Sequence, residues 1–303
     1  MPDILLLLPD FLLILSGFLL CRFTALNRSV WEAVERLVYY LLFPVLLFNS
    51  ILSSPLQSAS TARLAMAGPA TIFAGILLAH SLLLLPAVAK APLNRFHASG
   101  AQVAFRFNSF IALALAERLQ GAQGVAWVAL LIALCVPICN VAAVWPLARH
   151  GGHAYWRELS RNPLIIATLA GLSANLAGLH LPEAATLTLH RIGVAALPLG
   201  LMAVGAGLRF GAMKGAGWLA AALLSIRHGL LPLLALALAA LLDLPTGQRA
   251  LLVMFAALPT APSAYVLASR MGGQGPYVAG LVTLSTLLGM FTLPLWLLVL
   301  KFS

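Results

Sequence analysis

The sequence predicts an all-α polytopic membrane protein with ten transmembrane helices. Of its 303 residues, 62% are hydrophobic and only 9% are charged, and the mean hydropathy is +1.00. A soluble domain carries about 25% charged residues, so this chain has too little polar surface to cover a water-soluble globule of its size. The same composition excludes disordered and fibrous proteins, and three cysteines set no disulfide or redox framework.

Ten apolar runs define the predicted helices, because a helix needs about 20 apolar residues to cross the hydrocarbon core of a bilayer. Short connections between the runs leave no room for a soluble domain. The predicted spans are 4–21, 34–53, 64–88, 98–116, 125–147, 162–180, 187–208, 216–242, 248–268 and 277–300. The first run is a retained span, because Met1–Asp3 lacks the positive charge that opens a cleavable signal.

The distribution of arginine and lysine predicts the orientation of the spans. The connections after spans 1, 3, 5, 7 and 9 carry eleven of these residues, whereas the other connections and the termini carry five. Positive loops stay in the cytoplasm, so both termini are predicted to be extracytoplasmic. The net charge of +10 is spread singly between apolar runs, which indicates topology signals and no nucleic-acid partner.

Ten spans divide into two five-helix repeats, at 1–147 and 162–303, joined by a cytoplasmic loop at 148–161. An odd number of spans in each half makes the second repeat inverted relative to the first. Residues 116–121 resemble residues 268–273, 152 positions later, and Pro44 and Pro198 lie 154 apart. Inverted repeats are typical of transporters whose site forms near the midplane. Duplication also produces channels and inert scaffolds, so the repeat alone leaves these alternatives open.

Span 9 carries prolines near its centre. Pro259 and Pro262 each remove a backbone donor and clash with the preceding turn, which predicts a broken helix. Backbone groups freed inside a membrane survive only when they are buried in protein or line a wet cavity. Thr260 and Ser263 supply hydroxyl groups at the break. A substrate-binding role is therefore predicted here, with a proline kink packed by neighbouring helices as the alternative.

Span 4 brings an amide, a hydroxyl and a charge to a similar depth. Asn108 and Ser109 lie near its centre, and Arg106 lies beside them. Arg227 is placed around the middle of span 8, and a charge there costs several kcal/mol. The acidic residues all lie near span ends or in loops, so an anionic substrate could balance the two arginines. The alternative for each arginine is that it binds free carbonyls at a helix break.

Three further polar residues within spans are candidates for ion coupling or for supporting the binding residues. His228 could carry a coupling proton because the ordinary pKa of histidine is near neutrality. Asn49 and Asn140 could contact a coupling ion, H+ or Na+ being equally open. Interhelical hydrogen bonding explains all three residues at least as well. No metal site, other cofactor or catalytic residue is predicted.

Six short motifs, in their order and spacing, resemble those of a bacterial member of the auxin efflux carrier family. The resemblance covers nearly the whole chain. The motifs are Tyr40–Phe48, Asn108–Ser109, Asn140–Val141, Arg161–Ile165, Ala196–Leu199 and Leu258–Tyr265. A basic residue in span 8, here Arg227, also fits the family pattern.

The resemblance implies two inverted five-helix repeats, with broken spans 4 and 9 crossing at the centre and one bundle moving like an elevator. It also implies a small organic anion as substrate, such as a mono- or dicarboxylate, and favours a homodimer. Asn108 and the region of Pro259 would contact the substrate or shape its site. One departure concerns span 4, where Phe110–Ala114 has alanines in place of the family's Gly and Pro. This departure favours a less interrupted span 4.

The sequence therefore predicts a secondary carrier for a small organic anion, in contact with the lipid bilayer, and not an enzyme. A passive anion channel or a sensory membrane protein is the main alternative. A remote alternative is an intramembrane hydrolase with Ser263 as nucleophile and His228 as base, but Ser263 has no Gly-x-Ser-x-Gly motif around it.

Overall fold

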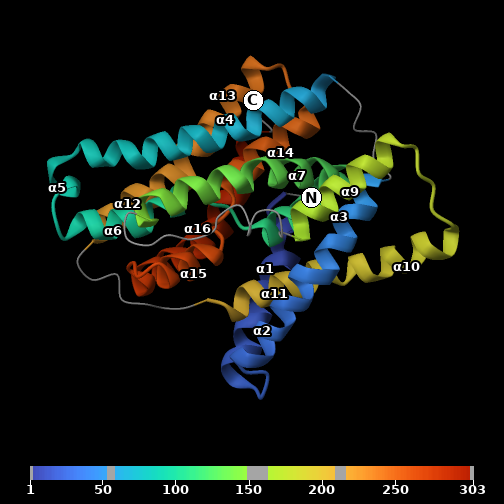
Figure 1. The fold of residues 1–303 in the computed structure, drawn as a ribbon, viewed down its shortest axis with the longest axis horizontal. Helices are drawn as coiled ribbons and strands as arrows, with labels where there is room; N and C mark the ends of the chain where they lie inside the picture. The colour runs from blue at the N-terminus through green and yellow to red at the C-terminus, as the bar shows by residue number, and fades with distance from the viewer. Residues whose placement is uncertain (1–2, 53–58, 149–162, 209–215, 301–303) are drawn as a thin grey trace. The chain divides into compact units, whose positions relative to one another are not determined.

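The chain is helical throughout most of its described length, as the sequence predicts. The computed structural model describes residues 3–52, 59–148, 163–208 and 216–300, and this part of the chain contains no strand (Figure 1). Six helices in the described ranges are long and apolar enough to cross a membrane. The ten-span topology, the inverted repeat and the outward termini stay predictions. The connecting loop predicted at 148–161 lies outside the described residues except for Ala148.

The described helices follow one another along the chain. The first are α1 (Asp3–Phe23), α2 (Arg28–Leu37), α3 (Phe43–Leu52), α4 (Ala59–Ser81), α5 (Pro86–Ala89), α6 (Leu93–Gly100) and α7 (Ser109–Ala148). The later ones are α9 (Pro163–Leu176), α10 (Glu183–Val194), α11 (Ala196–Ala206), α12 (Gly217–Ser225), α13 (Leu231–Leu241), α14 (Thr246–Ala257), α15 (Ser263–Arg270) and α16 (Gly275–Val299). Single π-helical turns, Val38–Leu42 and Ile226–Leu230, join α2 to α3 and α12 to α13.

The chain divides into two compact units, each of which draws segments from both halves of the sequence. Unit 1 comprises Met1–Ala62, Ser109–Ala133 and Tyr155–Gly207. Unit 2 comprises Arg63–Asn108, Leu134–Ala154 and Leu208–Ser303. The division concerns compactness alone, so the repeats at 1–147 and 162–303 stay a prediction.

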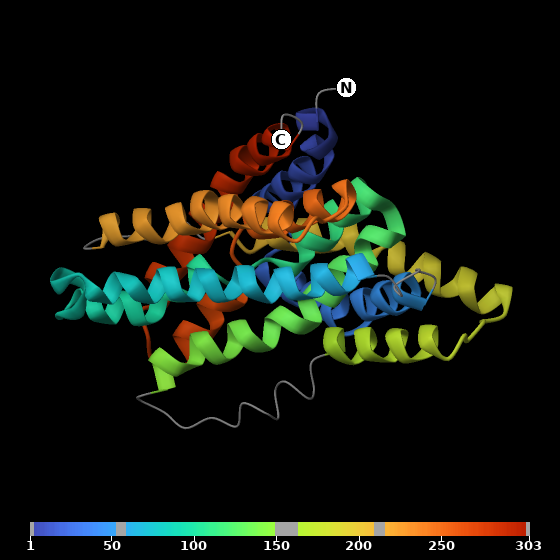
Figure 2. The ribbon, with the colours of Figure 1, turned by 90° about the horizontal axis from the view of Figure 1, so that it is seen from above.

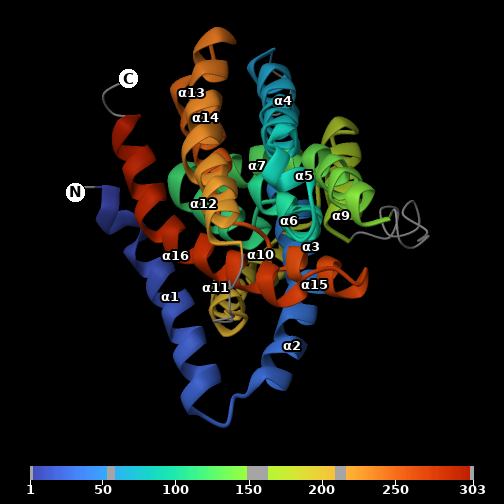
Figure 3. The ribbon, with the colours of Figure 1, turned by 90° about the vertical axis from the view of Figure 1, so that its left-hand side faces the viewer.

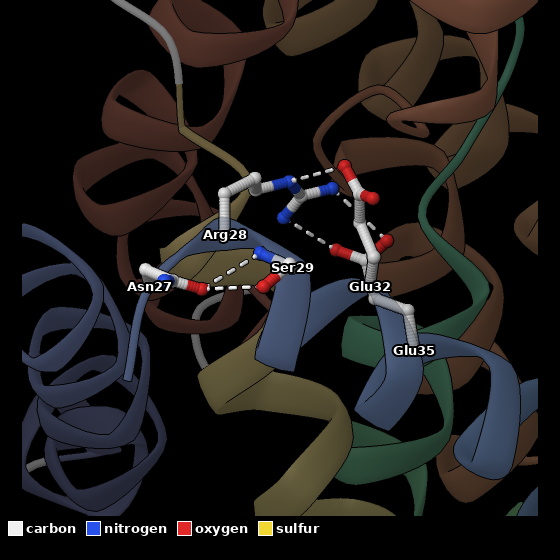
Figure 4. Close-up of polar contacts among 5 residues, drawn as sticks. All are labelled: Asn27, Arg28, Ser29, Glu32 and Glu35. Carbon is white, nitrogen blue, oxygen red and sulfur yellow. Dashed lines mark hydrogen bonds and ion pairs between the residues drawn. The ribbon is translucent and has the colours of Figure 1, made fainter. Parts of the chain in front are cut away.

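Unit 1 is built on close packing between α1 and α11. Gly17 and Gly205 lie at this contact, where a Cβ atom on either glycine would overlap a backbone carbonyl of the opposite helix. Such small residues let membrane helices approach closely. A sharp turn leads from α1 to α2 (Figure 3). Asn27 caps α2 by accepting a hydrogen bond from the Ser29 N–H, and Arg28 binds both carboxylate oxygens of Glu35 at 2.8 and 3.1 Å (Figure 4).

Unit 2 contains the helices that carry most of the predicted site. In it, α4 and α6 run side by side (Figure 2), and the His97 Nε2–H donates to the Ala79 carbonyl at 2.8 Å. The helices α12 and α13 continue one another through the π-helical turn at Ile226–Leu230. Because a π-turn inserts an extra residue into the helix, it changes the directions in which neighbouring side chains project.

Both predicted breaks occur in unit 2. Helix α14 ends at Ala257 and α15 begins at Ser263, so the prediction of a broken span 9 is confirmed. Span 4 is also interrupted: a short 3₁₀ turn, Ala101–Ala104, follows α6, and α7 begins only at Ser109. The alanines that replace the family's Gly and Pro therefore do not keep span 4 helical across this point.

Candidate functional site

The two interrupted helices meet at their non-helical segments, Phe105–Asn108 and Leu258–Pro262, which we call the crossover. The backbone N–H of Asn108 donates to the carbonyl of Pro259 at 2.8 Å. The Thr260 hydroxyl donates to the carbonyl of Val103 at 2.6 Å. The segment Leu258–Pro262 is thus bonded to Asn108 and to Val103 in the 3₁₀ turn just before Phe105, and such pairing is the condition for keeping unwound backbone inside a membrane.

A thiol from a third helix contacts the same crossover. The Cys139 Sγ atom lies 3.5 Å from the carbonyl oxygen of Phe105, in a buried position on α7. The sequence pattern of Cys135 and Cys139 indicates ordinary helix packing. The contact with Phe105 agrees with that interpretation and adds a weak hydrogen bond to the unwound segment.

Arg227 binds the end of the helix that leads into the crossover. Its side chain is completely buried, with Nε donating to the carbonyl of Leu258 and Nη2 to that of Phe255 at 3.3 Å. These carbonyls belong to the C-terminal end of α14, where the partial charge is negative and a cation is favourable. Of the two roles considered for Arg227, this geometry supports the binding of freed carbonyls. Its Nη1 atom is buried and has no hydrogen-bond partner among the described residues.

Arg106 lies at the opposite kind of helix end. Its Nη2 atom donates to the hydroxyl of Ser263 at 2.9 Å, and Ser263 is the first residue of α15. The Arg106 side chain is half-buried, whereas Pro262 and Ser263 are exposed. A helix N-terminus carries a partial positive charge, so a guanidinium, a hydroxyl and this helix end together provide favourable groups for an anion.

Acidic residues are almost absent from the unit that holds these groups. Asp243 is the single acidic residue in the three sequence segments of unit 2. Its side chain is 99% exposed and lies 3.8 Å from Arg63. The crossover of unit 2 therefore carries the guanidinium groups of Arg106 and Arg227, while Asp243 lies beside Arg63, and an anionic ligand would be electrostatically favoured at the crossover.

His228 lies next to Arg227 in the π-helical turn but interacts with different partners. Its Nε2 is 2.9 Å from the Ser285 hydroxyl oxygen, and its Nδ1 is 3.0 Å from that of Thr292. Ser285 also accepts a hydrogen bond from the backbone N–H of Thr260 at 3.0 Å. Ser285 and Thr292 were not predicted; their signal in the sequence is two hydroxyls seven residues apart on one apolar helix.

The structure brings most of the predicted site residues together, but not all. Around the crossover of unit 2 lie Arg106, Asn108, Arg227, Pro259, Thr260, Pro262 and Ser263. Asn140 is half-buried in the part of α7 that belongs to unit 2. Ser109 directly follows Asn108 at the start of α7, where the division into units falls. Asn49 belongs to unit 1, where it lines a cavity of about 360 Å³ together with Glu183, Thr186, Leu187 and His190.

Comparison with known proteins identifies one family. Residues 146–297 match the model of a family described as membrane transport protein, and this range includes α9 to α15 and most of α16. No curated protein matches the chain.

Proposed function

The chain belongs to the membrane transport protein family, which includes the auxin efflux carriers, and from this premise we propose that it carries a small organic anion across the inner membrane. Membership confirms the resemblance drawn from the sequence motifs, and with the apolar helices it makes the chain a multi-pass membrane transporter. The substrate we propose is a mono- or dicarboxylate. The movement we propose is alternating access of the elevator type.

The contact between Arg106 and Ser263 carries the proposal of an anionic substrate. It places a cation at the N-terminus of α15, beside Ser263 and Pro262, which are both exposed. A carboxylate there would gain charge-assisted hydrogen bonds from the guanidinium and the favourable end of a helix dipole. Arg227, buried behind the crossover, adds a second positive charge to the same unit.

The division into two units supports the elevator type of movement. Both helix breaks and the two buried or half-buried arginines belong to unit 2, so one compact unit contains most of the residues proposed to bind substrate. In alternating access, a site of this kind moves as a rigid group between the two faces of the membrane. We propose that His228, Asn49 or Asn140 couples transport to H+ or Na+. The alternative for each of these residues is that it only supports the binding residues through hydrogen bonds.

The geometry does not favour the hydrolase alternative. A serine nucleophile needs a base within hydrogen-bonding distance. Ser263 accepts a hydrogen bond from Arg106, whereas both ring nitrogens of His228 face the hydroxyls of Ser285 and Thr292. The pair required for acyl transfer is therefore not assembled in this arrangement.

Transport by purified protein in proteoliposomes tests the proposal directly. We expect saturable uptake of labelled malonate or lactate, and faster uptake when the vesicles are preloaded with the same unlabelled anion. Counter-transport of this kind requires a carrier, since a passive channel gives flux without exchange. Equal uptake by protein-free vesicles for every carboxylate in the panel would contradict the proposal. Imposed H+ and Na+ gradients in the same vesicles identify the coupling ion.

Substitution of Arg106 tests the position of the anion. Arg106→Gln keeps a hydrogen-bond donor but removes the charge, so we expect the apparent KM for the carboxylate to rise about tenfold or more, since a hydrogen bond to a charged group contributes about 1.5–3 kcal/mol. Arg63→Gln is the matched control, because Arg63 is an arginine of the same unit that binds the Leu242 carbonyl near Asp243. An unchanged KM for Arg106→Gln would remove Arg106 from the site.

A further inference from the structure

One face of α16 is directed at the crossover and at His228. Ser285, Gly289, Thr292 and Trp296 follow the helical spacing i, i+4, i+7 and i+11, so they form one stripe. A Cβ atom on Gly289 would lie 2.6 Å from Cγ of Pro259, which means that the glycine allows the crossover to approach α16. The indole of Trp296 donates to the carbonyl of His228 at 2.8 Å. The stripe therefore contacts both the crossover and the π-helical turn.

The peptide unit between Pro259 and Thr260 is held at both of its polar groups. Its carbonyl, on Pro259, accepts from the backbone N–H of Asn108 at 2.8 Å. Its N–H, on Thr260, donates to the hydroxyl oxygen of Ser285 at 3.0 Å. Thr260 and Ser285 are completely buried, so water cannot replace either partner. Of the two hydrogen bonds that orient this peptide, one is made by the backbone of Asn108 and the other by a side-chain atom, the Oγ of Ser285.

His228 completes the hydrogen bonding of that atom. A serine hydroxyl has one hydrogen and two acceptor positions, and the Thr260 N–H occupies one acceptor position. A neutral imidazole has one donor and one acceptor nitrogen, so Ser285 can donate to Nε2 while Nδ1–H donates to Thr292, or both bonds can run in the opposite direction. In the first arrangement the Thr260 N–H, the Ser285 hydrogen and both ring nitrogens of His228 all have partners, whereas in the second the hydrogen of Ser285 has no acceptor within this group; the first arrangement therefore satisfies the buried groups better.

We infer that Ser285 is a positioning residue of the anion site: it fixes the Pro259–Thr260 peptide at the crossover, and His228 and Thr292 fix the hydroxyl of Ser285. The inference rests on the proposed function, because it makes the geometry of the crossover, and hence substrate affinity, depend on α16. Thr286, the next residue, provides a contrast. Its hydroxyl donates at 2.9 Å to the carbonyl of Val282 in its own helix, although it is as well buried.

Transport kinetics of matched variants test the inference. Ser285→Ala removes the acceptor of the Thr260 N–H, so we expect the apparent KM to rise about tenfold, the equivalent of one buried hydrogen bond, while kcat changes less than about twofold. Thr286→Val removes a hydroxyl without loss of size and should keep the wild-type KM. A purely structural role would lower the amount of active protein, and therefore the maximal rate, and would leave KM unchanged. That result, or equal KM values for the two variants, would overturn the inference.

A second measurement does not depend on substrate. Ala261→Cys places a thiol in the crossover, in a background with Cys21→Ala, because Cys135 and Cys139 are buried. We expect Ser285→Ala to change the rate of labelling of this thiol by a membrane-impermeant maleimide at least about threefold, and Thr286→Val to leave it unchanged. If the wild-type protein transports no carboxylate, the proposed function fails while labelling still decides the positioning of the crossover. Equal labelling rates in both variants would overturn the inference.

Discussion

Asn108 contributes to the site through its backbone and through its side chain, and substitution separates the two. The hydrogen bond to Pro259 is made by the backbone N–H, so it is retained when the side chain changes. The amide side chain is buried at the crossover, with 2% of its surface exposed. Effects of substitution on substrate affinity therefore report on the side chain and not on loss of that backbone contact.

The sign of the charge on the substrate can be tested at this position. Asn108→Asp has nearly the size of asparagine but introduces a negative charge, which would repel an anion and compete with it for the arginines. We expect its apparent KM for a carboxylate to exceed that of Asn108→Ala, which should itself exceed the wild-type value about tenfold. Uptake of labelled malonate measures both. An Asn108→Asp protein with wild-type affinity would show that the site does not select anions.

Arg227 should affect stability as well as transport, because its guanidinium serves the carbonyls of Phe255 and Leu258. A buried acceptor left unpaired costs about 1–3 kcal/mol. Arg227→Met removes both donors, so we expect its melting temperature in detergent to fall by at least about 4 °C. The melting temperature of Arg227→Lys should fall less, since the lysine ammonium can still bind one carbonyl, although it lacks the planar guanidinium that binds two. Equal melting temperatures for the three proteins would show that these hydrogen bonds do not stabilise the end of α14.

At the scale of helices, the contact between α1 and α11 tests how unit 1 is held together. Replacing glycine by alanine within a helix ordinarily stabilises it by about 0.5–1 kcal/mol. At Gly17 and Gly205 the opposite is expected, because the added methyl group would overlap the backbone of Met202 or Ile14. We expect Gly17→Ala and Gly205→Ala to lower the monodisperse fraction in size-exclusion chromatography and the melting temperature. Gly217→Ala is the control, since open space surrounds Gly217; a fall as large in this variant would contradict the explanation.

The helices themselves could be predicted from hydropathy, because membrane insertion makes apolar length the dominant signal. The break at Pro259 could be predicted as well, since proline acts locally. The break at Phe105–Asn108 has no local proline or glycine to mark it. Within it Asn108 is bonded to Pro259 and Phe105 to Cys139, and Val103 just before it is bonded to Thr260; all three partners lie far away in sequence. The hydropathy of an apolar run is the same whether the helix is continuous, interrupted or π-helical. Hydropathy therefore could not locate this break or the π-helical turn at Ile226–Leu230.

The site residues, too, could be predicted where the signal is local in the sequence, but not where it depends on contacts with distant residues. The buried arginines were recognisable because charge is costly in a span, but their partners depend on tertiary packing. Arg227 binds carbonyls of α14, whereas Arg106 binds Ser263 on α15, and composition alone left both roles open for each of them. Ser285 escaped prediction because a serine in an apolar helix usually bonds within its own helix, as Thr286 does.

At the scale of the whole molecule, the elevator mechanism predicts that the crossover is reached from each side of the membrane in turn. We expect Ala261→Cys, in the Cys21→Ala background, to be labelled by an impermeant maleimide in both right-side-out and inside-out vesicles. In the same background His180→Cys, in the connection between α9 and α10 of unit 1, should react from one side only. Saturating substrate should shift the two Ala261→Cys rates in opposite directions, because a carrier exposes its site to one side at a time. In a channel open to both sides, substrate would change the two labelling rates in the same direction. Labelling of Ala261→Cys from a single side under every condition would contradict alternating access.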